Sequence, residues 1–167
     1  VDGGSTDRTV EVAKSYGKKV KVFAEKFEPM FHKNKQKAIE SAKGEWILQL
    51  DADESLSEEL KKEIATLLHG FIDKKTMKQS NNETIIDPVA YWLPRKNFFL
   101  TRFLMKGGQY PDYTIRLYRN GYARFPCKDV HENVEIKEEV GYLKNPILHY
   151  ADPDFSRYLM RWDRYTT

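Results

Sequence analysis

The chain has 167 residues, of which 28 are lysine or arginine and 25 are aspartate or glutamate. This length suits one domain with a sizeable core, and a net charge of +3 is too small to predict nucleic-acid binding by itself. No apolar run approaches the about 18–20 residues of a membrane span. The single cysteine, Cys127, excludes an internal disulfide framework and a Cys-rich zinc module. We therefore expect a reduced, cytosolic, globular protein.

The two ends of the sequence suggest a piece of a longer protein. The chain opens with Val1-Asp2-Gly3-Gly4, without an initiator methionine or a signal-peptide pattern. One apolar residue before a glycine turn is typical of the end of a β-strand, and residues 161–165 contain no helix stop signal. We expect a fragment that is incomplete at both ends.

Helix and strand signals alternate through the first half of the chain. The pattern predicts helices over residues 6–16, capped by Thr6, over residues 33–42, and after Ser57. Short apolar runs predict strands over residues 20–23 and 46–50. This alternation indicates a parallel α/β sheet.

The composition changes in the second half. Residues 73–88 are polar and close with a proline, which predicts a surface loop. Beyond this loop, apolar and aromatic runs predict several strands and then an amphipathic helix that begins after Asp154. The predicted strands cover residues 91–93, 97–100, 115–118, 123–125 and 146–150.

The sharpest local motif is Asp51-Ala52-Asp53-Glu54, which directly follows a predicted strand. Open α/β sheets bind ligands at the carboxyl ends of their strands. If a turn follows the strand, Asp51 and Asp53 can both reach one metal ion, and their oxygens suit Mg²⁺ or Mn²⁺, which neutralise a diphosphate. The same acids also suit an ordinary turn and helix start, and the motif alone does not decide between the two interpretations.

A second motif lies at residues 1–7, where a strand end, a glycine turn and a helix start follow one another. Such a turn lets the backbone approach a ligand closely, and Asp2 could accept a hydrogen bond from a base or a ribose. Taken alone, an ordinary loop with a capped helix is the better explanation.

The two motifs together resemble the family 2 glycosyltransferases, in which a VDxGSxDxT turn is followed by a DxD motif. Residues 1–13 (VDGGSTDRTVEVA) and 33–54 (KNKQKAIESAKGEWILQLDADE) carry this resemblance in the first half. The second half resembles the branch that contains lipopolysaccharide-core glycosyltransferases. The matching pieces there are residues 108–113, 116–119, 130–132 and 148–150, so the resemblance covers nearly the whole chain.

The resemblance implies the fold class. Family members have an α/β GT-A fold, in which a Rossmann-like, mostly parallel sheet with flanking helices is joined to a mixed, β-rich C-terminal half. We expect one domain over residues 1–167. Its nucleotide-sugar and metal half would cover residues 1–72, its acceptor half residues 89–150, and the start of a C-terminal helix residues 151–167.

The resemblance also implies the reaction and the partners. The enzyme would move a sugar, with inversion, from a nucleotide-diphosphate donor such as a UDP-sugar to a glycan of the cell envelope. This acceptor would be a lipopolysaccharide core or a surface polysaccharide, and it can be lipid-linked. Mg²⁺ or Mn²⁺ would be the cofactor, and no nucleic acid is expected. A cytoplasmic location is expected, with the inner face of the cytoplasmic membrane as an option. Basic and aromatic residues near Trp162 suit a peripheral membrane contact, although they equally suit a half-buried helix.

The donor-site residues are carried over by position from the family. Asp2 would contact the nucleotide, whereas Gly3 departs from the second aspartate that often follows, so any contact made by that acid is in doubt. Asp51 would face the ribose or the metal, and Asp53 would be the principal metal ligand. Lys35 would lie near the phosphates or the base.

The remaining site residues come from the second half. Glu132 is the preferred general base and Asp112 is its rival. Arg116 would neutralise phosphate by charge-assisted hydrogen bonds. His149 resembles the C-terminal histidine that some GT-A enzymes use as a third metal ligand, and a structural histidine is the competing interpretation.

Two other functions stay open on the sequence. A nucleotidyltransferase of GT-A-like fold would normally carry a basic, Gly-rich loop after its first strand, and that region is missing here. A non-catalytic module that binds glycans or nucleotides is the other alternative, because an incomplete chain can be inactive even where the parent protein is an enzyme. Replacement of Asp53 separates these classes, since a metal-free binder would keep its affinity.

Overall fold

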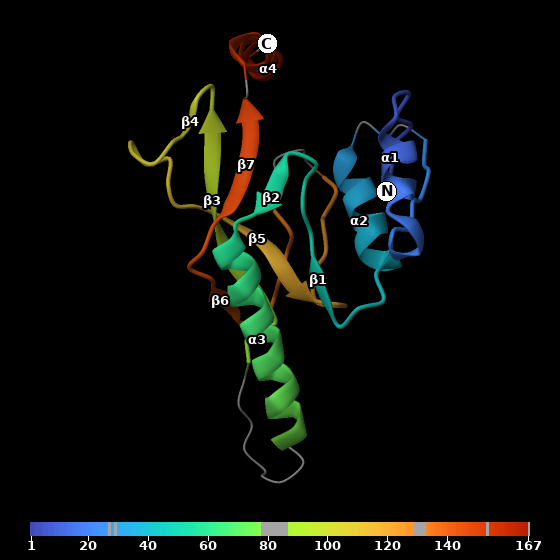
Figure 1. Cartoon of the computed structure of the whole chain (residues 1–167), viewed down its shortest axis with the longest axis vertical. Coiled ribbons are helices and arrows are strands. Elements are labelled where there is room, and N and C mark those ends of the chain that lie inside the picture. Colours follow the sequence, from blue (N-terminus) through green and yellow to red (C-terminus); the bar gives the residue numbers. More distant parts are fainter. Residues whose placement is uncertain (27, 29, 78–86, 129–132, 153, 167) are drawn as a thin grey trace. The chain divides into compact units, whose positions relative to one another are not determined.

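The computed structural model describes residues 1–26, 28, 30–77, 87–128, 133–152 and 154–166 (Figure 1). The chain forms two compact units. The first contains Val1–Ile47 and Arg119–Lys137, and the second contains Leu48–Tyr118 and Glu138–Thr167. None of the helices in the described ranges combines the length and the apolar character that a membrane crossing requires.

The first unit holds two α-helices, α1 (Thr9–Ser15) and α2 (Phe31–Ser41), a 3₁₀ turn at Gly17–Lys19, and the start of β1 (Trp46–Leu48). The first residues pair in parallel with the segment around Ala24. The Asp2 N–H donates to the Phe23 carbonyl, and the Glu25 N–H donates to the Asp2 carbonyl, both at 2.8 Å. The chain therefore begins in an extended conformation, as the apolar residue before the glycine turn predicted.

The start of α1 differs from the prediction. The helix begins at Thr9 with Arg8 as its N-cap, and Thr6 does not cap it. Asp7 takes that role in part, because its Oδ1 accepts the Thr9 N–H at 2.9 Å. An aspartate two residues before the first helical turn competes well for an unpaired N–H, so the polar run of residues 5–7 extends the loop and shortens the helix.

The second unit is built on a mixed sheet with the strand order β5-β3-β7-β2, and β4 and β6 also pair with β3. Strand β3 runs parallel to β6 and β7 and antiparallel to β4 and β5, whereas β2 runs antiparallel to β7. The bounds are β2 Glu54–Leu56, β3 Ala90–Phe99, β4 Arg102–Phe103, β5 Asp112–Arg119, β6 Val140–Tyr142 and β7 Ile147–Asp152.

The predicted α/β fold class is confirmed, and the sheet of the second unit is mixed, as the resemblance implied for the β-rich second half. The antiparallel pairs are β3 with β4, β3 with β5 and β2 with β7, and a tight turn joins β3 to β4. The predicted strands 91–93 and 97–100 merge into the ten residues of β3. The predicted strand 123–125 is only an isolated bridge between Arg124 and Glu135.

Two helices complete the second unit: α3 (Glu58–Met77) follows β2, and α4 (Phe155–Thr166) follows β7 (Figure 1). Ser57 caps α3 as predicted, because its Oγ accepts the Leu60 N–H at 3.2 Å. Helix α3 extends to Met77 and so takes up the first residues of the predicted loop 73–88, most of which lies outside the described residues. The buried core joins α3 to the sheet through Leu60, Ile64, Ala90, Tyr91, Leu93, Ile115, Leu117, Tyr118, Leu143, Ile147 and Ala151.

Replacement of Leu60 by alanine should test this core. Leu60 is fully buried, so Leu60→Ala removes apolar contacts and leaves a cavity that lowers the free energy of unfolding by about 2–5 kcal/mol. Urea unfolding followed by circular dichroism measures the change. The control is Leu159→Ala on α4, where the side chain is exposed and the expected change is under about 0.5 kcal/mol. Equal effects of the two variants would contradict the assignment of Leu60 to the core.

Candidate functional site

The acidic motif folds as a tight turn that leads into β2. The Glu54 N–H donates to the Asp51 carbonyl at 3.0 Å, and the Asp51 N–H donates to Glu54 Oε2 at 3.0 Å. Pairing with β7 then places Glu54 opposite His149, and the Tyr150 N–H donates to the Asp53 carbonyl at 2.8 Å. The turn and the strand pairing together bring the motif beside His149, far away in the sequence.

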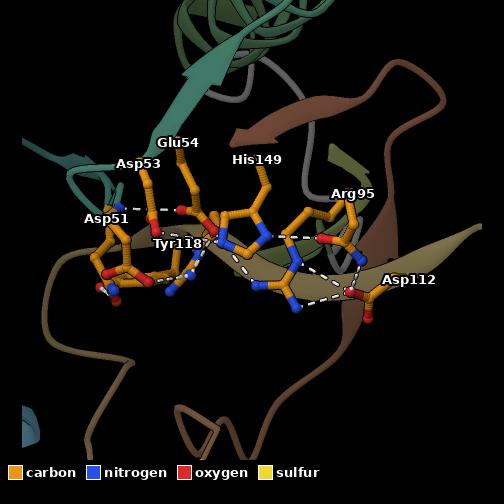
Figure 2. Close-up of polar contacts among 10 residues, drawn as sticks. Asp51, Asp53, Glu54, Arg95, Asp112, Tyr118 and His149 are labelled. Atoms are coloured by element: carbon orange, nitrogen blue, oxygen red, sulfur yellow. Dashed lines mark hydrogen bonds and ion pairs between the residues drawn. The ribbon is translucent and has the colours of Figure 1, made fainter. Parts of the chain in front are cut away.

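Asp53 and His149 face each other across this pairing. The distance from Asp53 Oδ2 to His149 Nε2 is 3.6 Å. The other ring nitrogen, Nδ1, lies 2.7 Å from Asn97 Oδ1. Figure 2 shows His149 between the carboxylates of the acidic motif on one side and the Arg95–Asp112 pair on the other. Two of the three predicted metal ligands, Asp53 and His149, are thus adjacent.

The geometry of this pair fits a shared divalent cation. Ligand atoms at about 2.0–2.2 Å from one cation lie about 3–4 Å apart, and the 3.6 Å between the Asp53 and His149 atoms falls in that range. Over the described ranges, no group of three or more histidine, cysteine, aspartate or glutamate side chains is arranged to hold a metal. The described residues therefore contain a candidate pair of ligands, which is also an Asp–His ion pair, and no complete metal site.

The Asp51 carboxylate of this turn is held by Arg116 of β5. Arg116 Nη2 donates to Asp51 Oδ2 at 2.6 Å and to Glu54 Oε1 at 2.7 Å. Both Arg116 and Glu54 are buried. Burial lowers the pKa of Arg116, but the charges of Glu54 and Asp51 and their hydrogen bonds outweigh it and raise that pKa above its usual value. Arg116 is therefore a buried cation that balances two carboxylates of its own chain.

A second ionic group lies on β3 and β5. Asp112 Oδ2 accepts hydrogen bonds from Arg95 Nε at 3.0 Å, Arg95 Nη2 at 2.7 Å and Asn97 Nδ2 at 2.9 Å. Burial raises the pKa of Asp112, but the hydrogen bonds from Asn97 and Arg95 and the Arg95 charge together lower it below its usual value. A carboxylate with a lowered pKa accepts a proton weakly, which is unfavourable for a general base.

Three further site residues were predicted, namely Asp2, Lys35 and Glu132. Asp2 and Lys35 belong to the first unit. The Asp2 carboxylate accepts the Ser5 hydroxyl and the N–H groups of Ser5 and Gly4, at 3.0 and 3.1 Å for the two N–H groups, and the Ser5 side chain is the largest cause of its lowered pKa. Lys35 Nζ lies 5.0 Å from the centre of the Phe31 ring. Glu132 lies outside the described residues. The roles predicted for these residues stay predictions.

Three members of the site, Glu54, Arg95 and Asn97, were not predicted as functional residues. The sequence places Glu54 in the acidic motif without a role of its own, and the structure makes it the first, buried residue of β2. Arg95 and Asn97 are polar residues two positions apart in β3, so they lie on one face of the strand. Two polar residues at alternate positions of a strand are the sequence signal for such a face. The prediction of separate strands over residues 91–93 and 97–100 hides this signal, because it leaves residues 94–96 outside a strand.

The ion pairs of Arg116 should dominate the stability of the turn. Removal of one partner of a buried ion pair costs about 3–5 kcal/mol, so Arg116→Met should lower the free energy of unfolding by that amount because Glu54 loses its nearest cation. Adding Glu54→Gln should recover a large part of the loss. The control Lys61→Met breaks the exposed pair with Glu58 and should cost less than about 1 kcal/mol. Urea unfolding that shows no recovery in the double variant would contradict this account.

Comparisons with known proteins address the family of the chain. The sequence profile of the family described as Glycosyl transferase family 2 matches residues 1–124. An "Uncharacterized glycosyltransferase" of Rickettsia bellii (strain RML369-C) is 46% identical over 66 residues, which cover 38% of this chain and 21% of that protein. The match thus spans about a fifth of the length of this curated relative. The mixed α/β architecture is consistent with a GT-A-type domain, and the chain belongs to glycosyl transferase family 2.

Proposed function

We propose that the chain forms the donor-binding part of an inverting, cation-dependent glycosyltransferase that acts on a cell-envelope glycan. The observation that carries this proposal is the 3.6 Å pair of Asp53 Oδ2 and His149 Nε2 in a chain of this family. Family membership supplies the reaction class. The inverting mechanism, the cation and the acceptor are proposed for the whole protein, of which this sequence can be a part. Family membership also favours a glycosyltransferase over a nucleotidyltransferase.

Asp53 and His149 are the proposed cation ligands. A divalent cation bound there would offset the negative charge of the departing diphosphate. An imidazole nitrogen is a softer ligand than an oxygen, so this mixed pair favours Mn²⁺ over Mg²⁺. Asp51 is proposed to face the donor ribose rather than the cation, because Arg116 already holds its Oδ2 at 2.6 Å.

Arg116 is proposed to act on the donor only through Asp51. Its guanidinium is buried and bound to two carboxylates, so a phosphate would have to displace an internal ion pair to reach it. Asp2 and Lys35 are proposed to contact the nucleotide, as the family resemblance implies. The Asp2 carboxylate, which already orders the glycine turn, would then serve both the turn and the nucleotide.

Glu132 is the proposed general base. It would take the proton of the acceptor hydroxyl while that oxygen attacks the anomeric carbon and the bond to the diphosphate oxygen breaks on the opposite side. Asp112 is the weaker candidate, since three hydrogen bonds to its Oδ2 and a lowered pKa reduce its basicity. The resemblance of the second half to lipopolysaccharide-core enzymes supports the envelope acceptor and a cytoplasmic site.

A peripheral membrane contact stays a prediction. Helix α4 exposes Phe155, Leu159, Met160 and Trp162, and such a surface suits a membrane as well as it suits a further part of the protein.

Calorimetric titration of UDP into the chain tests the cation site. UDP should bind with Mn²⁺ present and much more weakly with EDTA. Asp53→Asn, which keeps the shape and removes the charge, should weaken Mn²⁺-dependent binding at least about tenfold. The matched control is Glu59→Gln on the exposed side of α3, which should bind as the wild type does. Binding that is equal with EDTA and in Asp53→Asn would refute the cation site and favour a metal-free binding module.

Nucleotide release from a panel of UDP-sugars tests the base. With the sugar that gives turnover, Glu132→Gln should reduce the rate by about 10²–10⁴-fold and leave UDP affinity unchanged, because the base acts only on the acceptor. Asp112→Asn should instead weaken Mn²⁺-dependent UDP binding, since Asp112 contacts the residues around His149. A rate loss confined to Asp112→Asn with unchanged binding would make Asp112 the base.

A further inference from the structure

Asn97 lies between Asp112 and His149 on the middle strand of the sheet. In the sheet register Asn97 of β3 pairs with His149 of β7, and Arg95 of β3 pairs with Asp112 of β5. The Asn97 amide makes one hydrogen bond to each side, 2.9 Å to Asp112 Oδ2 and 2.7 Å to His149 Nδ1. The Asn97 amide therefore links the ion pair of Arg95 and Asp112 to His149, the candidate cation ligand on β7.

The orientation of this amide follows from Asp112. Arg95 donates two hydrogen bonds to Asp112 Oδ2 and carries a compensating charge, so Asp112 is an ionised carboxylate that can only accept. The Asn97 atom that faces Asp112 must then be the NH₂ group, and the carbonyl oxygen must face His149. A carbonyl oxygen cannot donate, so the proton of this hydrogen bond lies on His149 Nδ1.

The position of that proton determines what the other ring nitrogen can do. A neutral histidine carries one ring proton, so a proton on Nδ1 leaves a lone pair on Nε2. Nε2 is the atom that faces Asp53 Oδ2 at 3.6 Å. The negative charge of Asp53 attracts a proton to Nε2, which would block cation binding there. Of the two neutral forms of His149, the hydrogen bond to the Asn97 carbonyl favours the one that carries its proton on Nδ1 and keeps the lone pair on Nε2.

We propose that Asn97 is a positioning residue, which Arg95 and Asp112 orient so that it holds His149 in the tautomer that leaves Nε2 available to a divalent cation beside Asp53. This inference rests on the proposed function. In this inference Asp112 accepts the hydrogen bond that orients Asn97, which requires a carboxylate of low basicity. A general base requires a carboxylate of higher basicity. Hydrogen-bond partners behind a ligating histidine typically change metal affinity about 10–100-fold.

The first test is the tautomer of His149 in the metal-free wild-type chain. Long-range ¹H–¹⁵N correlation spectra at about pH 8 distinguish a protonated ring nitrogen from an unprotonated one, and His149→Gln identifies the signals among the four histidines. The expected result is a protonated Nδ1 and an unprotonated Nε2. A proton on Nε2 in the wild type would overturn the proposal without any variant.

The second test uses Asn97→Leu, which has nearly the same size and no hydrogen-bonding groups. It should move the proton to Nε2 and weaken Mn²⁺ binding, measured calorimetrically with UDP present, by about 10–100-fold. Asn145→Leu is the matched control, because Asn145 bonds Glu63 in the same unit and away from His149. An unchanged tautomer in a folded Asn97→Leu variant would overturn the proposal.

The two proposals fail in different ways. If the wild type has the expected tautomer and Asn97→Leu shifts it, the tautomer assignment is supported whatever the cation does. If the same wild type then shows no affinity for Mn²⁺ with UDP, the cation site of the proposed function is refuted, and with it the purpose assigned to the tautomer.

Discussion

The candidate site depends on the buried charge of Arg116. A carboxylate such as Glu54 is expensive to remove from water, and only a cation that makes direct hydrogen bonds offsets that expense. Arg116 supplies it at 2.7 Å and holds Asp51 at 2.6 Å with the same nitrogen. This interaction lets a strand begin at a buried glutamate, and the pairing of that strand with β7 then brings Asp53 beside His149. The other polar contacts of the site follow from this placement.

Positive and negative side chains alternate across the neighbouring strands. Arg116 lies between Asp51 and Glu54, and Arg95 lies near Glu54 on one side, at 3.5 Å, and Asp112 on the other, at 2.7 Å. Each carboxylate of this group has a guanidinium partner, whereas Asp53 has the imidazole of His149. Asp53 is therefore the acid of this group that faces an imidazole, and the arginines hold the remaining acids in fixed positions.

The sequence predicted the elements that local signals control and missed those that depend on distant partners. The cap of α3 at Ser57 and the helix α2 follow from nearby residues, and both formed where they were expected, within two residues for α2. Strand β2 has only three residues, and its pairing is with β7, so no local pattern could reveal it. Family resemblance correctly indicated the glycosyltransferase family, but it could not show that Asn97 joins two candidate site residues, because that contact arises from the sheet register.

The pairing of β2 with β7 also sets an order of assembly. The acidic motif is synthesised early, whereas its partner strand arrives only after the chain has left the second unit at residue 119 and returned to it at residue 138. Closing so long a loop carries an entropic cost before any contact offsets it. A ribosome-bound chain that stops before β7 has the acidic turn without the strand that positions it. The placement of Asp53 beside His149 therefore forms only after β7 has been synthesised.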